Sequence, residues 1–294
     1  MLLVTFEPPA EAPRAGLLSG DSVLDLDVPM REFITRWPEG RDGLADQANK
    51  TYPLHGVRLL APLPDPPSLR DFYAFEQHVT TAHRIRGREV APEWYEFPVF
   101  YFSNHRPIFG PEGAVPRPSY TQALDYELEV AAVIGQTCRD VPPDQAEDVI
   151  LGFMIYNDWS ARDVQRREVR VGLGPAKAKD FAQSFGPWLA TTDELADRRT
   201  GRPGVYDLLM IARVNGVERS RGNWKDIHYS FGDLISRASD GVTLYPGDVI
   251  GSGTVGTGSL LEQTGGQGPW LQPGDVVELE VERLGVLRST VAGP

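Results

Sequence analysis

Two glutamates in alternate positions, Glu127 and Glu129, are the first residues whose spacing suggests chemistry. They lie in LDYELEVAAVIG (124–135), which alternates and then becomes wholly apolar, a pattern that predicts a strand entering the core. A two-residue offset puts both carboxylates on one strand face, roughly 7 Å apart. At about 6 Å and an effective dielectric near 20, such anions repel by on the order of 3 kcal/mol. On a solvated face the pair is ordinary, but in a core it calls for a cation.

Two aspartates, Asp158 and Asp71, stand at predicted element boundaries. Asp158 ends the apolar strand pattern LGFMIYND. Asp71 precedes apolar or small residues at 72, 75, 79 and 82, a spacing that predicts a helix to about residue 84 with Asp71 as its N-cap. Turn formation and capping explain each aspartate taken alone. Together with the glutamates they would form an all-oxygen site, which selects Mg²⁺, Ca²⁺ or Mn²⁺ over zinc.

The overall composition narrows the class of protein. The chain has 294 residues, with 41 acidic and 29 basic side chains and a formal charge of −12, which disfavours nucleic acid or an anionic membrane as partner. Its one cysteine, Cys138, excludes an intramolecular disulfide framework and a cysteine-rich metal site. The first residues lack the pattern of a secretory signal, and no apolar stretch approaches the length of a membrane helix. We therefore expect a soluble, cytoplasmic protein.

Turn-forming residues indicate an α+β, mainly β fold. The chain contains 30 glycines and 25 prolines, which favours many short strands. The proline-rich stretch APLPDPPS (61–68) predicts a stiff connector. We place a domain boundary there, between a small N-terminal α+β domain (1–65), with one helix in VPMREFITRW, and a larger domain (66–294).

Local motifs predict individual turns and helices. Asn215-Gly216 suits a type I′ hairpin, and the repeated Pro-Gly of LYPGDVI and LQPGDVV suits type II turns. A short helix with proline at its start is predicted at 142–150, and another from Ser160, with Asp163 as a near-match to a capping box. Gly251-x-Gly253-x-x-Gly256 satisfies the dinucleotide fingerprint, but no helix pattern follows it. We interpret it as a loop that lines a pocket.

Several of these segments together resemble the fumarylacetoacetate hydrolase superfamily. The matching stretches, in order, are DFYAFEQH (71–78), DYELE (125–129), NDWSARDVQ (157–165), GPAKAKDF (174–181), SGT (252–254) and GSLLE (258–262). The resemblance covers roughly residues 66 to 290 and is closest in motif to fumarylacetoacetase-type members. It implies a mixed β-roll catalytic domain, usually paired as a homodimer, behind a small N-terminal domain.

The resemblance also implies a role for each matching residue. The expected metal ligands are Asp71, Glu127, Glu129 and Asp158. The expected catalytic groups are the base His78, its orienting acid Glu262, and the anion-stabilising Arg162, Gln165 and Lys179. The expected substrate contacts are Tyr73, Tyr101 and Thr254. Spacing makes two of these roles plausible, because a helix from residue 72 would place His78 two turns after Asp71, and Arg162 and Gln165 are three apart on one helix.

The implied activity is metal-dependent hydrolysis of a carbon–carbon bond in a β-diketone such as fumarylacetoacetate or an acylpyruvate. A His–Glu activated water attacks, and a metal-bound enolate leaves, with Mg²⁺ as the expected ion and Ca²⁺ or Mn²⁺ as alternatives. Such an enzyme would serve the catabolism of aromatic amino acids or other aromatic compounds. The same superfamily also includes decarboxylases, isomerases and dehydratases of 2-oxo acids, and a non-catalytic metal-stabilised binding module is a third alternative.

Departures from the family pattern leave the substrate open. The acylpyruvate hydrolase and oxaloacetate decarboxylase branch carries its partner glutamate three residues after the histidine, where this chain has Thr81. The family often has Gly-Thr shortly after the position of Lys179, whereas this chain has Ala182-Gln183. The arginine that would bind a substrate carboxylate could be Arg84, Arg86 or Arg88.

Overall fold

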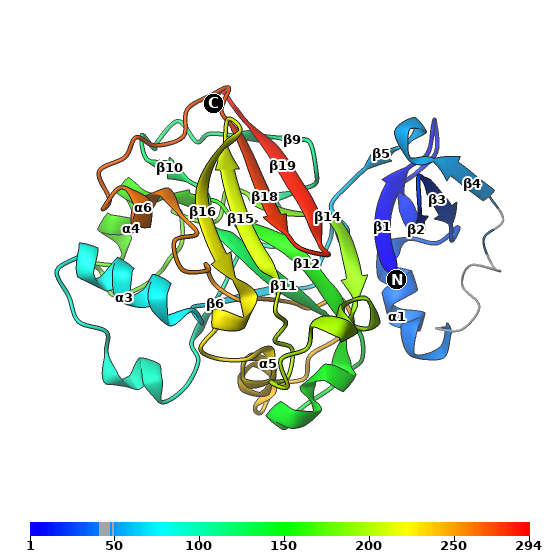
Figure 1. Cartoon of the computed structure of the whole chain (residues 1–294), viewed down its shortest axis with the longest axis horizontal. Coiled ribbons are helices and arrows are strands. Elements are labelled where there is room, and N and C mark those ends of the chain that lie inside the picture. The colour runs from blue at the N-terminus through cyan, green and yellow to red at the C-terminus, as the bar shows by residue number, and fades with distance from the viewer. Residues whose placement is uncertain (41–47, 49) are drawn as a thin grey trace.

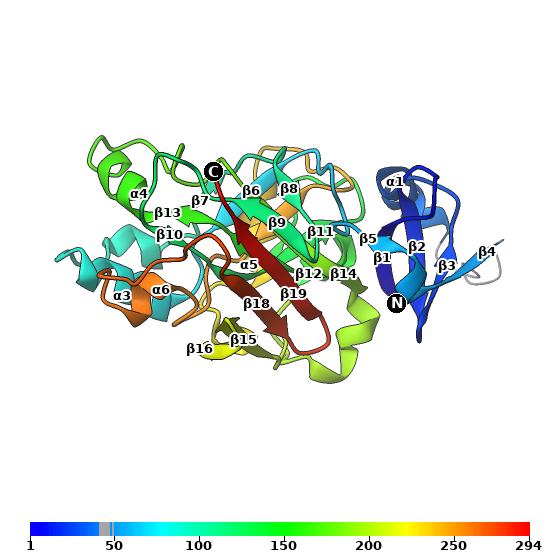
Figure 2. The same ribbon diagram turned by 90° about the horizontal axis from the view of Figure 1, so that it is seen from above.

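The computed structural model describes residues 1–40, 48 and 50–294. A small N-terminal unit, made of strands β1 to β5 and helix α1 (Met30–Gly40), stands at one end of the molecule, and helices α3, α4 and α6 gather at the other (Figures 1 and 2). The helix α1 confirms the one predicted in VPMREFITRW. Among the described residues, no helix is both long and apolar enough to cross a bilayer.

A large mixed sheet runs through both parts of the chain. Its strands, in pairing order, are β4 (Lys50–Pro53), β3 (Ser22–Asp25), β2 (Arg14–Ser19), β1 (Leu2–Glu7), β14 (Gln183–Thr191), β12 (Ile150–Asp158), β11 (Leu128–Ile134), β17 (Val249–Gly251), β6 (Leu69–Phe72) and β7 (Phe100–Phe102). Strand β5 (Arg58–Leu59) also pairs with β1, and β8 (Ile108–Phe109) with β14. The pairing of β1 with β14 joins the N-terminal unit and the larger part of the chain in one sheet. The predicted domain boundary near residue 65 therefore stays a prediction.

A second sheet packs against the first. It contains β16 (Val217–Asn223), β15 (Leu209–Val214), β18 (Val276–Val281), β19 (Gly285–Ala292) and β9 (Gly113–Pro116), while β10 (Leu124–Asp125) and β13 (Ser160–Ala161) form a separate pair. The other α-helices are α3 (Glu76–Ile85), α4 (Arg162–Glu168), α5 (Phe231–Ser239) and α6 (Leu260–Gln263). Short 3-10 helices span Leu54–Gly56, Pro92–Tyr95, Pro143–Val149, Thr192–Arg198 and Trp224–Asp226. The mainly β, mixed architecture confirms the predicted fold class.

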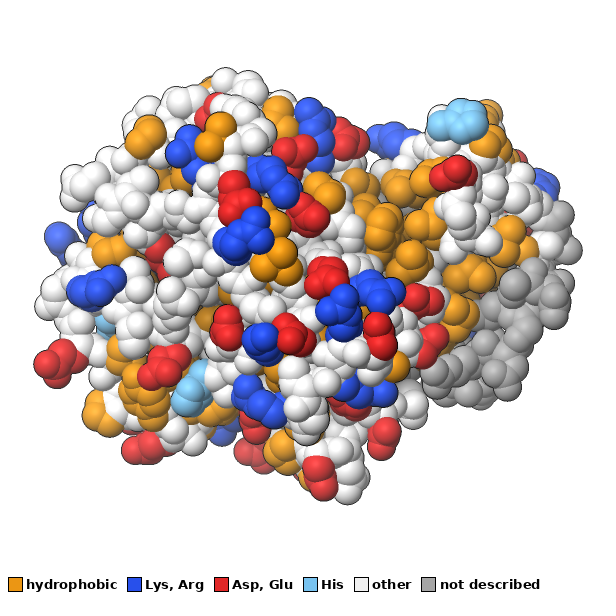
Figure 3. Space-filling model, viewed as in Figure 1, with side chains coloured by type: hydrophobic (Ala, Val, Ile, Leu, Met, Phe, Trp, Pro, Cys, Tyr) orange, Lys and Arg blue, Asp and Glu red, His pale blue; other side chains and the backbone are white. Residues whose placement is uncertain are grey.

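The central strand β11 is buried on both faces, as its apolar run predicts. Leu128 and Val130 join the core between the two sheets. Ala131 and Val133 face the opposite core, which includes Phe33 of α1. Hydrophobic side chains also gather in the hollow between the N-terminal unit and the remainder (Figure 3). A carboxylate on β11 therefore sits inside protein rather than on a solvated face.

The predicted turns are confirmed by the backbone. Asn215 and Gly216 have φ of 53° and 74° and join paired Val214 and Val217, as a type I′ hairpin requires. Gly247 and Gly274 have φ of 91° and 95°, the conformation that the third residue of a type II turn needs. The predicted helix at 142–150 forms as the 3-10 helix Pro143–Val149.

Two local predictions are wrong. Asp71 does not cap a helix, because it lies inside β6, where its backbone pairs with Gly251 on one side and Tyr101 on the other. These sheet hydrogen bonds override the helical spacing, and α3 begins only at Glu76. Ser160 does not open a capping box either, because it belongs to β13 and the carboxylate of Asp163 accepts hydrogen bonds from Thr121 and Gln122 instead.

Candidate active site

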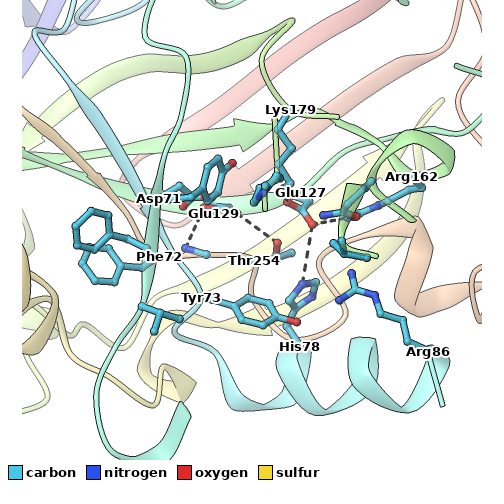
Figure 4. A pocket seen from close by; sticks show the side chains of 18 residues that line it. Asp71, Phe72, Tyr73, His78, Arg86, Glu127, Glu129, Arg162, Lys179 and Thr254 are labelled. Carbon is cyan, nitrogen blue, oxygen red and sulfur yellow. Dashed lines mark hydrogen bonds and ion pairs between the residues drawn. The ribbon is translucent and has the colours of Figure 1, made fainter. Parts of the chain in front are cut away.

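A cavity of about 260 Å³ lies beside the first turn of α3, between β6, β11 and α4. Ten of the twelve residues expected to form the site line it: Asp71, Tyr73, His78, Tyr101, Glu127, Glu129, Arg162, Gln165, Lys179 and Thr254 (Figure 4). The other two, Asp158 and Glu262, contact members of this set directly. The fold thus brings together all the side chains that the sequence singled out.

Three carboxylates meet at the buried floor of the cavity. Oxygens of Asp71, Glu129 and Asp158 lie within 4.8 Å of one another, and each comes from a different strand of the large sheet. Gly251 on the intervening strand β17 makes this approach possible. A Cβ at that position would lie 2.4 Å from Asp71 Oδ1, so only glycine leaves room for the carboxylate.

The electrostatics of this acidic triad (Asp71, Glu129 and Asp158) favour a cation. Burial, together with the charge of Asp158, raises the pKa of Asp71 well above its ordinary value. Burial and the charge of Asp71 do the same to the pKa of Glu129. The Oδ1 atoms of Asp71 and Asp158 are buried and accept no hydrogen bond among the described residues. Oxygen donors that are crowded, desolvated and unsatisfied fit a hard divalent ion such as Mg²⁺.

The fourth expected ligand, Glu127, is held by cations in this structure. Its Oε1 lies 2.8 Å from a terminal nitrogen of Arg162, and Lys179 Nζ bridges its Oε2 and Asp158. Burial opposes ionisation of Glu127, but the charges of Arg162 and Lys179 outweigh it and lower the pKa of the carboxyl. Glu127 therefore borders the triad as a charged group, and its role as a ligand stays a prediction.

A buried histidine and glutamate form a pair next to these carboxylates. His78 Nδ1 lies 2.8 Å from Glu262 Oε2, and both side chains are almost fully buried. The start of α6 fixes Glu262, because Thr257 N donates to its Oε1 and Ser259 Oγ to its Oε2, each at 3.0 Å. The other ring nitrogen, His78 Nε2, lies 3.9 Å from Glu127 Oε1. The imidazole therefore has one nitrogen at an acid and the other toward the cavity.

The remaining expected residues surround these groups. Gln165 Oε1 accepts from Arg162 at 3.1 Å, as their three-residue spacing on a helix predicts. The Tyr73 ring meets the His78 ring edge-on, with ring centroids 5.5 Å apart. Burial raises the pKa of the Tyr73 hydroxyl to about 12. Tyr101 donates to Asp158 Oδ2 at 2.7 Å, and Thr254 donates to Glu129 Oε1 at 3.3 Å. Both hydroxyls position carboxylates of the acidic triad in addition to bordering the cavity.

The sequence reasoning missed two buried residues that support the site. Asp125 Oδ2 lies 2.8 Å from Arg162 Nε, and its carboxylate accepts from the backbone of Leu260 and Leu261 at the start of α6. It lies two residues before Glu127, so the same alternation that selected the glutamates could have selected it. The side-chain amide of Gln183 donates a hydrogen bond of 2.7 Å to the backbone carbonyl of Lys179, which holds the loop that carries this lysine.

Comparison with known proteins places these features in a family. Residues 68–292 match the model of the C-terminal region of fumarylacetoacetate hydrolases. A 2,4-didehydro-3-deoxy-L-rhamnonate hydrolase of Sphingomonas is 35% identical over 66% of this chain, and the match spans 65% of its own length, just under two thirds. A human mitochondrial oxaloacetate tautomerase is 34% identical over 99% of this chain and 91% of its own.

A solved structure supports the same relationship over the whole chain. The 5-carboxymethyl-2-hydroxymuconate delta-isomerase of Mycobacterium smegmatis superposes with a TM-score of 0.76 at 28% identity, and the match covers all of both chains. The relatives thus include a hydrolase, a tautomerase and an isomerase, all enzymes that are named for small-molecule substrates. The chain belongs to the fumarylacetoacetate hydrolase family.

Proposed function

We propose that the protein is a divalent-metal-dependent hydrolase that cleaves a carbon–carbon bond in a β-diketone acid of the fumarylacetoacetate or acylpyruvate type. The observation that carries this proposal is a histidine–glutamate pair placed beside three buried carboxylates at one cavity. A structural ion needs carboxylates but no general base. The pair therefore argues against a non-catalytic metal-stabilised module.

The acidic triad would hold the metal ion, with Glu127 as the expected fourth ligand. We propose Mg²⁺ because all of these donors are carboxylate oxygens. A divalent ion in this position supplies Lewis acidity, which stabilises negative charge on substrate oxygens. The unsatisfied oxygens of Asp71 and Asp158 support this assignment.

His78 acts as the general base in this proposal. Glu262 contacts Nδ1, so the Nε2 atom is left to accept a proton from water. The water oxygen forms a bond to one carbonyl carbon of the substrate. The bond from that carbon to its neighbour then breaks, and the electron pair leaves with the neighbouring carbon, which takes up a proton. The products are a carboxylic acid and a ketone.

Two buried cations stabilise the negative charge that develops on the attacked carbonyl. Arg162 and Lys179 both line the cavity, and their neighbours fix them in position. Carboxylates around each group outweigh burial and raise its pKa, so both stay charged. Cations held in place before the reaction cost no reorganisation when charge appears.

A second candidate function is proton transfer or decarboxylation on a 2-oxo acid. The observation that favours it is the match to the human oxaloacetate tautomerase over nearly the whole chain, because tautomerisation also needs a positioned base. The partner of His78 favours a histidine–glutamate pair of the fumarylacetoacetase type. It is Glu262 rather than residue 81, which is Thr81 in this chain.

The proposal is tested by following the ultraviolet absorbance of an acylpyruvate enol with purified protein. We expect the absorbance to fall after addition of Mg²⁺, to stop falling after EDTA, and to fall again after excess Mg²⁺. Oxaloacetate is tested in parallel for decarboxylation and for enol–keto exchange. Turnover of oxaloacetate without turnover of any diketone would replace hydrolysis by the second function, and no turnover of either would favour the binding module.

A further inference from the structure

The loop of residues 255–258 leads from the catalytic cavity to helix α6 and contains the last glycine of the motif that begins at Gly251. Within it, Thr257 N donates to Glu262 Oε1 at 3.0 Å. Glu262 in turn contacts His78 Nδ1 at 2.8 Å through its other oxygen. The direction in which Glu262 points therefore depends on the conformation of this loop.

Thr257 has an uncommon backbone conformation for a threonine. Its φ is 68°, and among the described residues other than glycine that have positive φ it is the only β-branched one. A branched side chain crowds the backbone in this region, so the conformation costs energy unless the surroundings hold it. Gly256 and Gly258 flank Thr257, and neither has positive φ. Threonine thus occupies the position in this loop that glycine would suit best.

The surrounding elements hold the loop from two sides. On one side lies α3, because a Cβ at Gly256 would stand 2.3 Å from Gln77 Oε1. On the other side lies the edge strand β16, because a Cβ at Gly222 would stand 2.7 Å from a methyl carbon of Val255. The loop therefore fits closely between the helix that carries His78 and the second sheet.

The polar atoms of Thr257 connect three parts of the molecule. Its Oγ1 lies 3.3 Å from Ser220 Oγ and donates to the backbone carbonyl of Arg221 at 3.4 Å, both on β16. Its carbonyl accepts from Gln263 Nε2 of α6 at 2.9 Å, and its N–H holds Glu262. A glycine at this position would keep the two backbone contacts and lose the anchor on β16.

We propose that Thr257 is a positioning residue for the pair of His78 and Glu262. Its side chain anchors the loop to β16 in a strained conformation, and this conformation directs the N–H that orients Glu262. The inference rests on the proposed function, in which His78 is the general base. General-base catalysis depends on the orientation of the base, so a looser loop should slow the reaction. Removing the strain should therefore cost activity without costing stability.

The test is Thr257→Gly, assayed on an acylpyruvate at saturating Mg²⁺. We expect kcat to fall about tenfold or more while KM stays within about twofold. The melting temperature should stay level or rise by up to about 3 °C, because glycine adopts positive φ without strain. Thr257→Ser retains the hydroxyl and should keep kcat within about threefold of wild type.

Ala10→Gly is the matched control. Ala10 also has positive φ, 60°, but it is exposed in the N-terminal unit at the opposite end of the molecule from α3 and α6 (Figure 1). This variant removes the same kind of backbone strain and should leave kcat within about twofold of wild type. An equal loss of kcat in Ala10→Gly would overturn the inference.

Three results with the loop variants would also overturn it. The first is a kcat of Thr257→Gly within about twofold of wild type. The second is a fall in kcat that comes with a clear fall in melting temperature, because that is the effect of a merely structural residue. The third is an equal loss of kcat in Thr257→Ser and Thr257→Gly, because the hydroxyl would then not be the anchor.

Failure of the proposed function is distinguishable from failure of this inference. If the wild-type protein turns over no substrate, proton nuclear magnetic resonance of the Mg²⁺-loaded protein follows the Nδ1–H signal of His78, which His78→Ala identifies by its loss. We expect a sharp downfield signal in the wild type and in Thr257→Ser, and a broadened or shifted one in Thr257→Gly. An identical signal in Thr257→Gly would refute the positioning role.

Discussion

Replacing Glu262 by glutamine tests the catalytic pair with little steric change. In the wild type, Glu262 accepts two hydrogen bonds at the start of α6 and contacts His78 Nδ1 at 2.8 Å. A glutamine can keep its carbonyl oxygen toward Thr257 N, but its amide then donates to Nδ1. That hydrogen bond favours the tautomer with hydrogen on Nε2, which cannot accept a proton from water.

The size of the effect follows from the same geometry. Opposite unit charges 2.8 Å apart attract by about 6 kcal/mol at an effective dielectric near 20, which is an upper limit because the imidazolium charge is shared over the ring. General-base catalysis contributes roughly 10²- to 10⁴-fold, or about 3 to 5 kcal/mol. We therefore expect Glu262→Gln to lower kcat by roughly 10²- to 10⁴-fold and to leave KM and Mg²⁺ affinity nearly unchanged.

The assay is the loss of acylpyruvate absorbance at saturating Mg²⁺, with a melting curve to verify folding. Glu282→Gln is the control, because Glu282 pairs with Arg198 in a half-exposed ion pair away from the cavity and should change kcat by less than about twofold. A Glu262→Gln protein that melts normally and retains more than about a tenth of wild-type kcat would refute the role of the pair.

Three further perturbations have expected outcomes. Asp125→Asn removes the buried partner of Arg162 and should lower the free energy of unfolding in urea by about 3 to 5 kcal/mol, whereas a loss below about 1 kcal/mol would show that the pair is dispensable. Gly251→Ala puts a Cβ 2.4 Å from Asp71 Oδ1 and should therefore weaken Mg²⁺ binding at least about tenfold, as measured by calorimetry. Unchanged Mg²⁺ affinity would contradict the close approach of Asp71 to Gly251. Saturating wild-type protein with Mg²⁺ to about 100 times Kd should add about 2.7 kcal/mol of stability, and a melting temperature insensitive to EDTA would argue against the site.

Much of the site could be predicted because its motifs are local. The alternation around Glu127 and Glu129 predicts two carboxylates on one strand. Glu129 lies on β11, Glu127 directly precedes it, and β11 is buried on both faces as expected. The role expected of Lys179 rests on motif position alone, and the structure buries this lysine while it exposes the neighbouring Lys177. The Asn215-Gly216 hairpin could be predicted because the type of turn depends on two adjacent residues that tolerate positive φ.

The parts that failed depend on tertiary pairing. The spacing after Asp71 is helical, but hydrogen bonds from β17 and β7 draw residues 71 and 72 into the sheet. His78 therefore does not lie two helical turns beyond Asp71 as predicted, although the bend between β6 and α3 still brings His78 to the cavity. Which of the three candidate arginines enters the catalytic cavity also depends on the end of α3, where Arg86 lines the cavity and Arg84 and Arg88 do not.

The central claim is that Asp71, Glu129 and Asp158 hold one divalent ion. The most direct measurement is a titration of metal-free protein with Mn²⁺, followed by electron paramagnetic resonance. We expect one tight site per chain in the wild type and in His78→Ala, and binding at least about a hundredfold weaker in Glu129→Gln. Tight binding that survives in Glu129→Gln, or its loss in His78→Ala alone, would contradict the account.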